Sequence, residues 1–282
     1  MNKLLSGTAM AVLLTAGFAG TADAGRIVLT GHDNDYHCDG CSGKSTSGPG
    51  AALAAEVAYV SAGSALPVLT FDAGSLLTNT LTALGISFVN VDPSNAANVT
   101  AGLFDHTKYS AMVVASVTSC GGCDNTPADI SHIAAQSAAI ASFFNAGGGV
   151  LGLAGARDTS AYSYVPEAAT NAGGSPPSSG YVSAVTNTTG IPPVNGDATH
   201  NFFDEPGTGG LSDKYFVVER LGDPSTGTPE TIAFSGSIVC TGPSCHLTTG
   251  GGSTVPEPAS LALLGSGLTG LAALARRRRK KA

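Results

Sequence analysis

Short apolar runs alternate with amphipathic segments through the first half of the chain. The runs Arg26–Thr30, Ile86–Val91 and Ala111–Val117 are rich in Val and Ile, which favours strands, and the last is continuously apolar, as in a buried parallel strand. Ser75–Leu84 and Ala128–Asn145 place apolar residues at helical spacing, and glycine follows each segment. This alternation predicts one α/β domain with a mainly parallel sheet flanked by helices.

The chain changes character after Gly173. Pro, Ser and Asn are abundant up to about Thr199, which indicates a long surface segment. Tyr215–Arg220 and Thr231–Val239 are again strand-like, and we expect them to add an antiparallel edge to the same sheet.

The net charge of the chain argues against one class of partner, nucleic acid. The net charge of the 282 residues is −7, but six of the 13 basic residues form the run Arg276–Lys281, so the rest of the chain is more acidic than that value. An acidic surface repels phosphate groups, and nucleic acid is therefore not an expected partner. The 38 Gly and 15 Pro residues are too few to indicate a disordered low-complexity chain.

The N-terminal segment has the organisation of an export signal. Lys3 precedes the apolar run Met10–Ala19, and small residues stand at Ala22 and Ala24. This order is typical of a secretory signal peptide, so we expect a signal helix at residues 1–24 that signal peptidase removes after Ala24. The alternative is a permanent anchor helix, for which the apolar run is short.

The C-terminal segment, residues 251–282, has three consecutive parts. The tripeptide Pro256, Glu257 and Pro258 precedes the uncharged stretch Ala259–Ala275, which as a helix would cover about 25 Å, the short limit of a transmembrane span. A basic cluster follows and should stay in the cytoplasm. The cluster consists of Arg276, Arg277, Arg278, Arg279, Lys280 and Lys281.

These three parts resemble the PEP-CTERM sorting signal of exported bacterial proteins. The resemblance implies recognition and cleavage near the Pro-Glu-Pro motif by an exosortase-type membrane enzyme. It also implies an inner-membrane intermediate and a final place at the cell surface or in the extracellular matrix of a Gram-negative bacterium, where surface polysaccharide is a candidate partner. A permanent tail anchor has the same topology, but it has no need of the tripeptide. Residues 25–250 form the exported body.

The stretch Ala146–Ala156 (AGGGVLGLAGA) follows the clearest predicted helix. Its glycine-rich break, strand and Gly-Leu-x-Gly-Ala turn resemble the elbow of class I glutamine-amidotransferase-like domains of the trehalose-utilisation type. The resemblance implies a flavodoxin-like α/β fold for the body. At the position where that family carries a nucleophilic Cys or, in this branch, a His, the chain has Ala154, whose methyl group can neither attack a carbonyl nor accept a proton. Enzymatic activity of the amidotransferase kind is therefore not expected.

All six cysteines occur in closely spaced pairs, and an even number in an exported chain indicates disulfides first. Zinc is the main alternative, because two Cys-x-x-Cys units supply the four thiolates of a tetrahedral site. A redox role is the third reading. The pairs are Cys38 with Cys41, Cys120 with Cys123, and Cys240 with Cys245.

The densest group of reactive side chains follows the first predicted strand. His32, Asp33, Asp35 and His37 occur within six residues and run directly into Cys38. Imidazoles suit zinc or iron and carboxylates suit harder cations, so this loop could hold a metal or another ligand. The alternative is an ordinary polar turn.

Two functions remain open from the sequence. The first expectation is a non-catalytic binding or structural domain at the cell surface, stabilised by disulfides and without a cofactor. The alternative is a metal-assisted hydrolase acting on carbohydrate at the cell surface. The second requires the histidines, aspartates and cysteines of the two Cys-x-x-Cys loops to converge around a metal with an open position for water.

Overall fold

The computed structural model describes the greater part of the body. The described residues are 25–38, 48–118, 124–153, 160–166, 182–183, 189–192, 203, 215–223, 228–242 and 244–248. The predicted signal peptide, the predicted span at residues 259–275 and the elbow position Ala154 lie outside these ranges. Within them, no helix is both long and apolar enough to cross a membrane.

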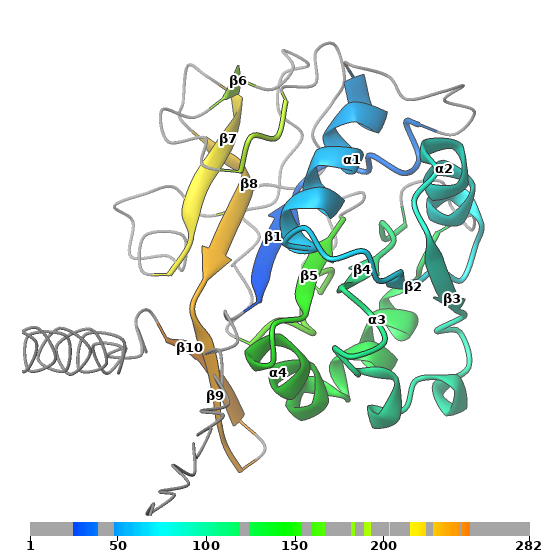
Figure 1. The fold of residues 1–282 in the computed structure, drawn as a ribbon, viewed down its shortest axis with the longest axis vertical. Coiled ribbons are helices and arrows are strands. Elements are labelled where there is room, and N and C mark those ends of the chain that lie inside the picture. Colours follow the sequence, from blue (N-terminus) through cyan, green and yellow to red (C-terminus); the bar gives the residue numbers. More distant parts are fainter. Residues whose placement is uncertain are drawn as a thin grey trace, which may run out of the picture.

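An eight-stranded sheet with the order β3-β2-β4-β5-β1-β8-β7-β6 forms the centre of the molecule (Figure 1). The five strands from β3 to β1 are parallel, whereas β8, β7 and β6 continue the sheet in antiparallel pairing. This arrangement confirms the α/β class and the antiparallel edge. The strands are β1 (Arg26–Thr30), β2 (Val68–Phe71), β3 (Phe88–Val91), β4 (Ala111–Val114), β5 (Gly149–Gly152), β6 (Val182–Ser183), β7 (Val217–Asp223) and β8 (Thr228–Ser235).

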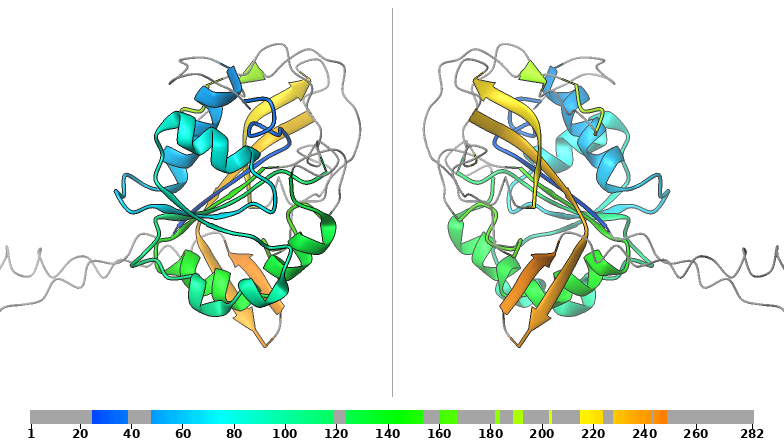
Figure 2. Two further views of the ribbon diagram at one scale, coloured as in Figure 1. Left: turned by 90° about the vertical axis from the view of Figure 1, so that its right-hand side faces the viewer. Right: turned by 90° about the vertical axis from the view of Figure 1, so that its left-hand side faces the viewer.

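Helices cover both faces of the parallel strands, with α1 (Gly48–Val60) and α2 (Leu76–Leu84) on one face and α3 (Pro127–Ala134) and α4 (Ser137–Asn145) on the other (Figure 2). Two 3-10 turns, Ala96–Asn98 and Ala101–Leu103, connect β3 to β4. Successive side chains of a strand point to opposite faces of the sheet, so the sheet separates the apolar core into two clusters, one under each pair of helices.

The two faces of β4 show how complete this division is. Ala111 and Val113 belong to the apolar cluster under α1 and α2. Met112 and Val114 belong to the cluster under α3 and α4. All four side chains are buried, as expected for a strand that is one continuous apolar run in the sequence.

The single helix expected at Ala128–Asn145 is in fact two helices. Thr126 caps the first one, its hydroxyl accepting a hydrogen bond from the backbone N–H of Asp129. The chain leaves helical geometry at Gln136 (φ −99°, ψ 19°), and α4 begins at the next residue. Apolar spacing continues across this break, since Ile133 and Ile140 are both buried in the same cluster, and the pattern therefore could not reveal it.

The single strand expected at Thr231–Val239 is also interrupted. β8 ends at Ser235, and after Gly236 the chain forms a separate hairpin of β9 (Ser237–Thr241) and β10 (Ser244–Thr248). A Cβ on Gly236 would lie 2.6 Å from the Phe234 ring and from the carbonyl oxygen of Thr248, so only glycine fits at this bend. The hairpin projects beyond the sheet on the side of α4 (Figure 2).

Candidate functional site

The loop after β1 lies at the carboxyl edge of the parallel strands, the usual place for ligand sites in α/β folds. Two backbone hydrogen bonds shape it: the N–H of Gly31 donates to the carbonyl of Glu230 at 2.8 Å, and the N–H of His37 donates to the carbonyl of Asp33 at 3.1 Å. The second bond closes a turn that brings the side chains of residues 32–37 back toward one another.

Three of the predicted ligand residues converge in this turn. His32, Asp33 and His37 each offer one nitrogen or oxygen atom, and these atoms all lie within 4.8 Å of one another. His37 Nε2 is 3.2 Å from Asp33 Oδ1, and the two imidazole rings are 5.2 Å apart between centroids. The side chains of His32 and Asp33 are almost completely buried, whereas that of His37 is 26% exposed, so the group opens to solvent at His37.

Asp35, the fourth predicted residue, makes different contacts. Its carboxylate accepts hydrogen bonds from the hydroxyl and the backbone N–H of Ser116, the latter at 3.0 Å. Its carbonyl accepts a hydrogen bond from the Thr80 hydroxyl at 3.1 Å. Burial raises the pKa of Asp35 to about 6, against the lowering effect of the Ser116 hydrogen bonds. Asp35 thus ties the loop to the end of β4 and to α2.

A buried ion pair that the sequence pattern did not predict supports the same loop. The Asn34 amide donates to both carboxylate oxygens of Glu56, at 3.1 and 3.0 Å. Arg220 Nη2 donates to Glu56 Oε1 at 2.7 Å, and its Nη1 donates to the carbonyl of Pro192 at 2.9 Å. Burial raises the pKa of Glu56, whereas the charge of Arg220 opposes that shift. The pair joins α1, β7 and the loop.

Glu230 forms a second buried carboxylate contact beside β1. Its two oxygens accept hydrogen bonds from the hydroxyls of Thr30 and Thr231, each at 2.7 Å. The Tyr162 hydroxyl donates to the carbonyl of Thr30 at 2.7 Å, and burial raises the pKa of this tyrosine well above its ordinary value. These contacts hold the end of β1, from which the loop begins.

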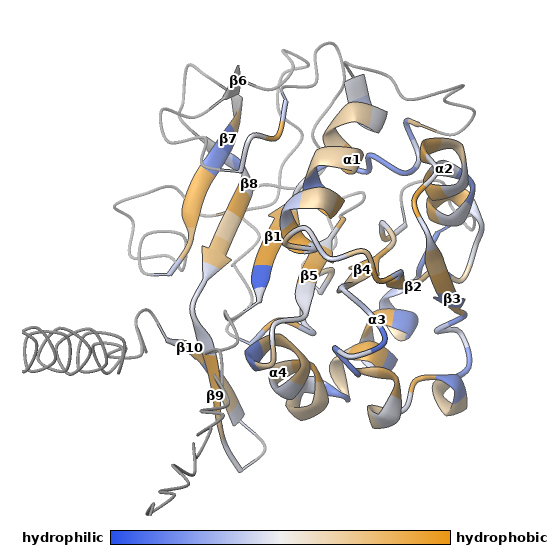
Figure 3. Cartoon of the chain, viewed as in Figure 1, coloured by the Kyte–Doolittle hydropathy of each residue, from blue (hydrophilic) through white to orange (hydrophobic). Residues whose placement is uncertain are grey.

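Negative groups greatly exceed positive ones in this region. Among the described residues, Arg220 is the only buried Lys or Arg. The buried carboxyl groups of the loop and its supports are Asp33, Asp35, Glu56 and Glu230. A lone Glu in the apolar helical segment around residue 56, and charged residues within strand-like runs, were the signals that could have revealed these supports (Figure 3).

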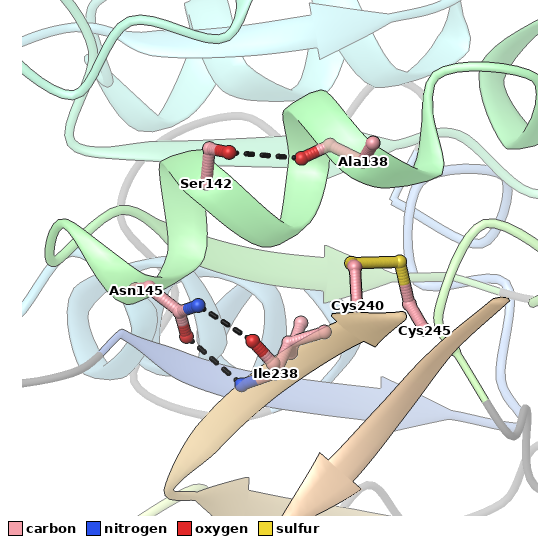
Figure 4. Close-up of a disulfide and its surroundings, with 6 residues drawn as sticks. All are labelled: Ala138, Ser142, Asn145, Ile238, Cys240 and Cys245. Atoms are coloured by element: carbon pink, nitrogen blue, oxygen red, sulfur yellow. Dashed lines mark hydrogen bonds between the residues drawn. A yellow bond between two sulfur atoms is a disulfide. The ribbon is translucent and has the colours of Figure 1, made fainter. Parts of the chain in front are cut away.

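Two of the predicted disulfide cysteines lie far from the loop. Cys240 and Cys245 are bonded to each other across β9 and β10, which confirms that pair (Figure 4). Cys38 is buried and is also in a disulfide, so it offers no thiolate to a metal. Cys41, Cys120 and Cys123 lie outside the described residues.

Comparison with known proteins assigns only the C-terminal segment. Residues 254–280 match the family model of the PEP-CTERM protein-sorting motif, which includes the predicted tripeptide, the uncharged stretch and most of the basic cluster. Neither the curated proteins nor the solved structures contain a significant match to the chain, so the resemblance to amidotransferases gains no support there. The matched motif supports export by the exosortase route, recognition by an exosortase-type enzyme and sorting to the bacterial cell surface.

Proposed function

We propose that the protein is a cell-surface or matrix-bound binding protein, whose body is displayed outside the cell after exosortase processing. The observation that carries this proposal is the sorting motif at residues 254–280, which begins only a few residues after β10, the last described strand. Only residues 249–253 separate β10 from the motif, so the body is presented to the exosortase directly next to its sorting signal.

The proposed order of events follows from the two chain ends. Signal peptidase removes residues 1–24, and the apolar stretch 259–275 holds an inner-membrane intermediate with residues 276–281 in the cytoplasm. An exosortase-type enzyme then cleaves near Pro256, Glu257 and Pro258, and the body reaches the surface of a Gram-negative cell. Surface polysaccharide is the proposed partner there.

Two observations favour a binding role for the body over catalysis. Ala154 stands where the amidotransferase-like elbow would carry its nucleophile. Buried polar side chains nevertheless gather at the carboxyl edge of the sheet, where α/β proteins bind ligands. Ligand binding at this edge requires no nucleophile, so both observations fit a binding domain.

The route is tested by expressing the full chain in a bacterium that has an exosortase. In wild-type cells we expect a shortened form at the surface or in the matrix. The triple variant Pro256→Ala, Glu257→Ala and Pro258→Ala should accumulate at full length in the membrane fraction, whereas the adjacent control Ser253→Ala should be processed normally. Equal processing of the triple variant and the wild type would contradict the proposal.

The alternative function, a metal-assisted hydrolase acting on carbohydrate, is favoured by the convergence of His32, Asp33 and His37. It is tested by incubating the metal-loaded protein with surface polysaccharide and measuring new reducing ends. Hydrolysis that disappears in Asp33→Asn and persists in Asp105→Asn would establish the alternative. The absence of hydrolysis in the metal-loaded protein would leave the binding role.

A further inference from the structure

We propose that His32, Asp33 and His37 bind one divalent transition-metal ion of the zinc class. This inference deepens the proposed binding function, on which it rests for its role outside the cell, and it names the ligand of the carboxyl-edge site.

The distances suit a metal centre. With metal–ligand bonds of about 2.1 Å, neighbouring ligand atoms of a tetrahedral or octahedral ion are separated by about 3.0–3.4 Å. Asp33 Oδ1 and His37 Nε2 are 3.2 Å apart, within that range. The other two separations involve His32 and are within 4.8 Å, so a bound ion would draw these side chains closer together. His37, the most exposed of the three, is the least confined by its surroundings.

The donor set selects the class of ion. Two imidazoles and one carboxylate favour zinc, iron, cobalt, nickel or copper, whereas calcium and magnesium prefer sites made entirely of oxygen. Three protein ligands leave at least one coordination position open. That position is available for water or for a donor group of a surface partner.

The surroundings of the three ligands favour a cation. Four buried carboxyl groups stand against one buried guanidinium, and Arg220 already pairs with Glu56 at 2.7 Å. Burying several carboxyl groups with few cations is costly, and a divalent ion at the ligands would offset part of this cost. Moreover, the side-chain oxygen of Asn34, between Asp33 and Asp35, has no hydrogen-bond partner among the described residues.

The loop is held in a nearly fixed shape before metal arrives. After Asp33, Asn34 is anchored on Glu56 and Asp35 on Ser116. Before it, the N–H of Gly31 is bonded to the carbonyl of Glu230, so the ligand Asp33 lies between anchored residues. Restraint of this kind lowers the cost of ordering the ligands on binding. Entry is through the exposed side, where Tyr36 is 40% and His37 is 26% exposed.

The test uses the full chain, made in an oxidising compartment, purified in detergent and treated with chelator. Titration with Zn²⁺ should show one ion per chain by calorimetry. Replacement with Co²⁺ should give visible absorption bands that report nitrogen and oxygen ligands. His37→Ala and Asp33→Asn should each weaken Zn²⁺ binding by about 100-fold or more, because losing a direct ligand costs at least as much as losing an outer-shell partner, about 10–100-fold. His106→Ala and Asp105→Asn, an exposed and a partly exposed residue of the same types in another loop, should bind as the wild type does.

The His37→Ala variant keeps the test interpretable, because His37 is partly exposed and its loss should leave the fold intact; near-ultraviolet circular dichroism checks this. Wild type that binds no Zn²⁺, or a folded His37→Ala variant that binds as tightly as wild type, overturns the inference. The processing experiment is independent: normal surface display without metal binding removes only the metal site. Metal binding with failed processing removes only the proposed route.

Discussion

The loop that follows β1 and the hairpin that follows β8 lie at opposite ends of these two antiparallel strands, and different interactions stabilise them. At the carboxyl end of β1, the loop of residues 31–38 has no regular structure and depends on buried polar contacts. At the opposite edge of the sheet, β9 and β10 depend on strand pairing, a disulfide and buried Ile238 and Leu247 (Figures 1 and 4). Buried polar groups are costly unless they are paired, whereas apolar burial and a cross-link stabilise without such pairing.

The loop has the features of a binding site, whereas the hairpin has those of an attachment point for the tail. The loop presents imidazoles and a carboxylate in a preset arrangement, which is useful for binding and unfavourable as mere support. The hairpin presents no such group at its buried side; instead Asn145 of α4 hydrogen-bonds both the N–H and the carbonyl of Ile238, at 2.8 and 2.6 Å (Figure 4). The hairpin is also the element nearest the sorting motif, so it joins the body to the tail.

The largest effect is expected where a buried charge loses its partner. Arg220→Met leaves the Glu56 carboxylate buried without its ion pair, which should lower the free energy of unfolding by about 3–5 kcal/mol. Urea unfolding of the full chain, followed by near-ultraviolet circular dichroism of its tyrosines, measures this loss. The control Lys108→Met removes the exposed pair with Asp105 and should change little.

The double variant Glu56→Gln with Arg220→Met sharpens this result. It removes both charges, so it should be more stable than Arg220→Met alone. If Arg220→Met were as stable as the wild type, the ion pair would not stabilise the loop. The loop would then not depend on buried polar contacts in the way that distinguishes it from the hairpin.

A smaller effect is expected at the hairpin. Replacing Cys240 and Cys245 together by Ser opens a very short loop, for which chain entropy gives a loss of about 2 kcal/mol in the free energy of unfolding. Because the hairpin is at the opposite edge of the sheet, Zn²⁺ affinity should be unchanged. A loss of metal binding in this variant would show that the hairpin influences the β1 loop, which would contradict the view that the two regions are independent.

A still smaller effect is expected from Asn145→Ala. The variant loses two hydrogen bonds to the Ile238 backbone, but position 145 is exposed and water can replace them in part, so a loss of about 1 kcal/mol in the free energy of unfolding is expected. Ser142→Ala, one turn earlier, removes a hydroxyl that bonds only within α4 and should have less effect. Hydrogen exchange at the Ile238 amide measures the local opening.

The smallest effect concerns a carboxyl outside both regions. Hydrogen bonds from the Thr107 hydroxyl and backbone and from Lys108 lower the pKa of the partly exposed Asp105 to about 2. A lowered pKa in the folded state adds stability above the ordinary value, near pH 4, and this contribution is lost as the pH falls toward 2. Asp105→Asn should therefore be slightly less stable than the wild type at neutral pH, and the difference should vanish near pH 2. Carboxyl chemical shifts during an acid titration measure the pKa directly.

Much of the fold was predictable because it depends on local periodicity. β1 begins and ends where the apolar run does, and α2 ends at Gly85, whose φ of 69° is the left-handed conformation that glycine adopts readily. The break at Gln136 and the bend at Gly236 were not predictable. The first leaves the apolar spacing unchanged, and the second depends on how closely Phe234 and Thr248 approach the glycine.

The candidate site was predictable only in its composition. A dense group of His and Asp after a strand indicated chemistry at the carboxyl edge, and His32, Asp33 and His37 do lie together. The role of Asp35 as a contact to Ser116 was not visible, because the two residues are 81 positions apart. Glu56 and Arg220, separated by 164 positions, could be paired only by the packing of α1 against the sheet.

The sequence by itself determined the destination of the protein, its α/β class and the chemical types in the β1 loop, because sorting motifs, hydrophobic periodicity and residue clusters are all local in the chain. Only the tertiary structure decided which carboxyl groups face the histidines, which are paired with Arg220, and which edge of the sheet the disulfide hairpin occupies. Those choices depend on burial and on contacts between distant segments, and such contacts form only when the sheet brings its strands together.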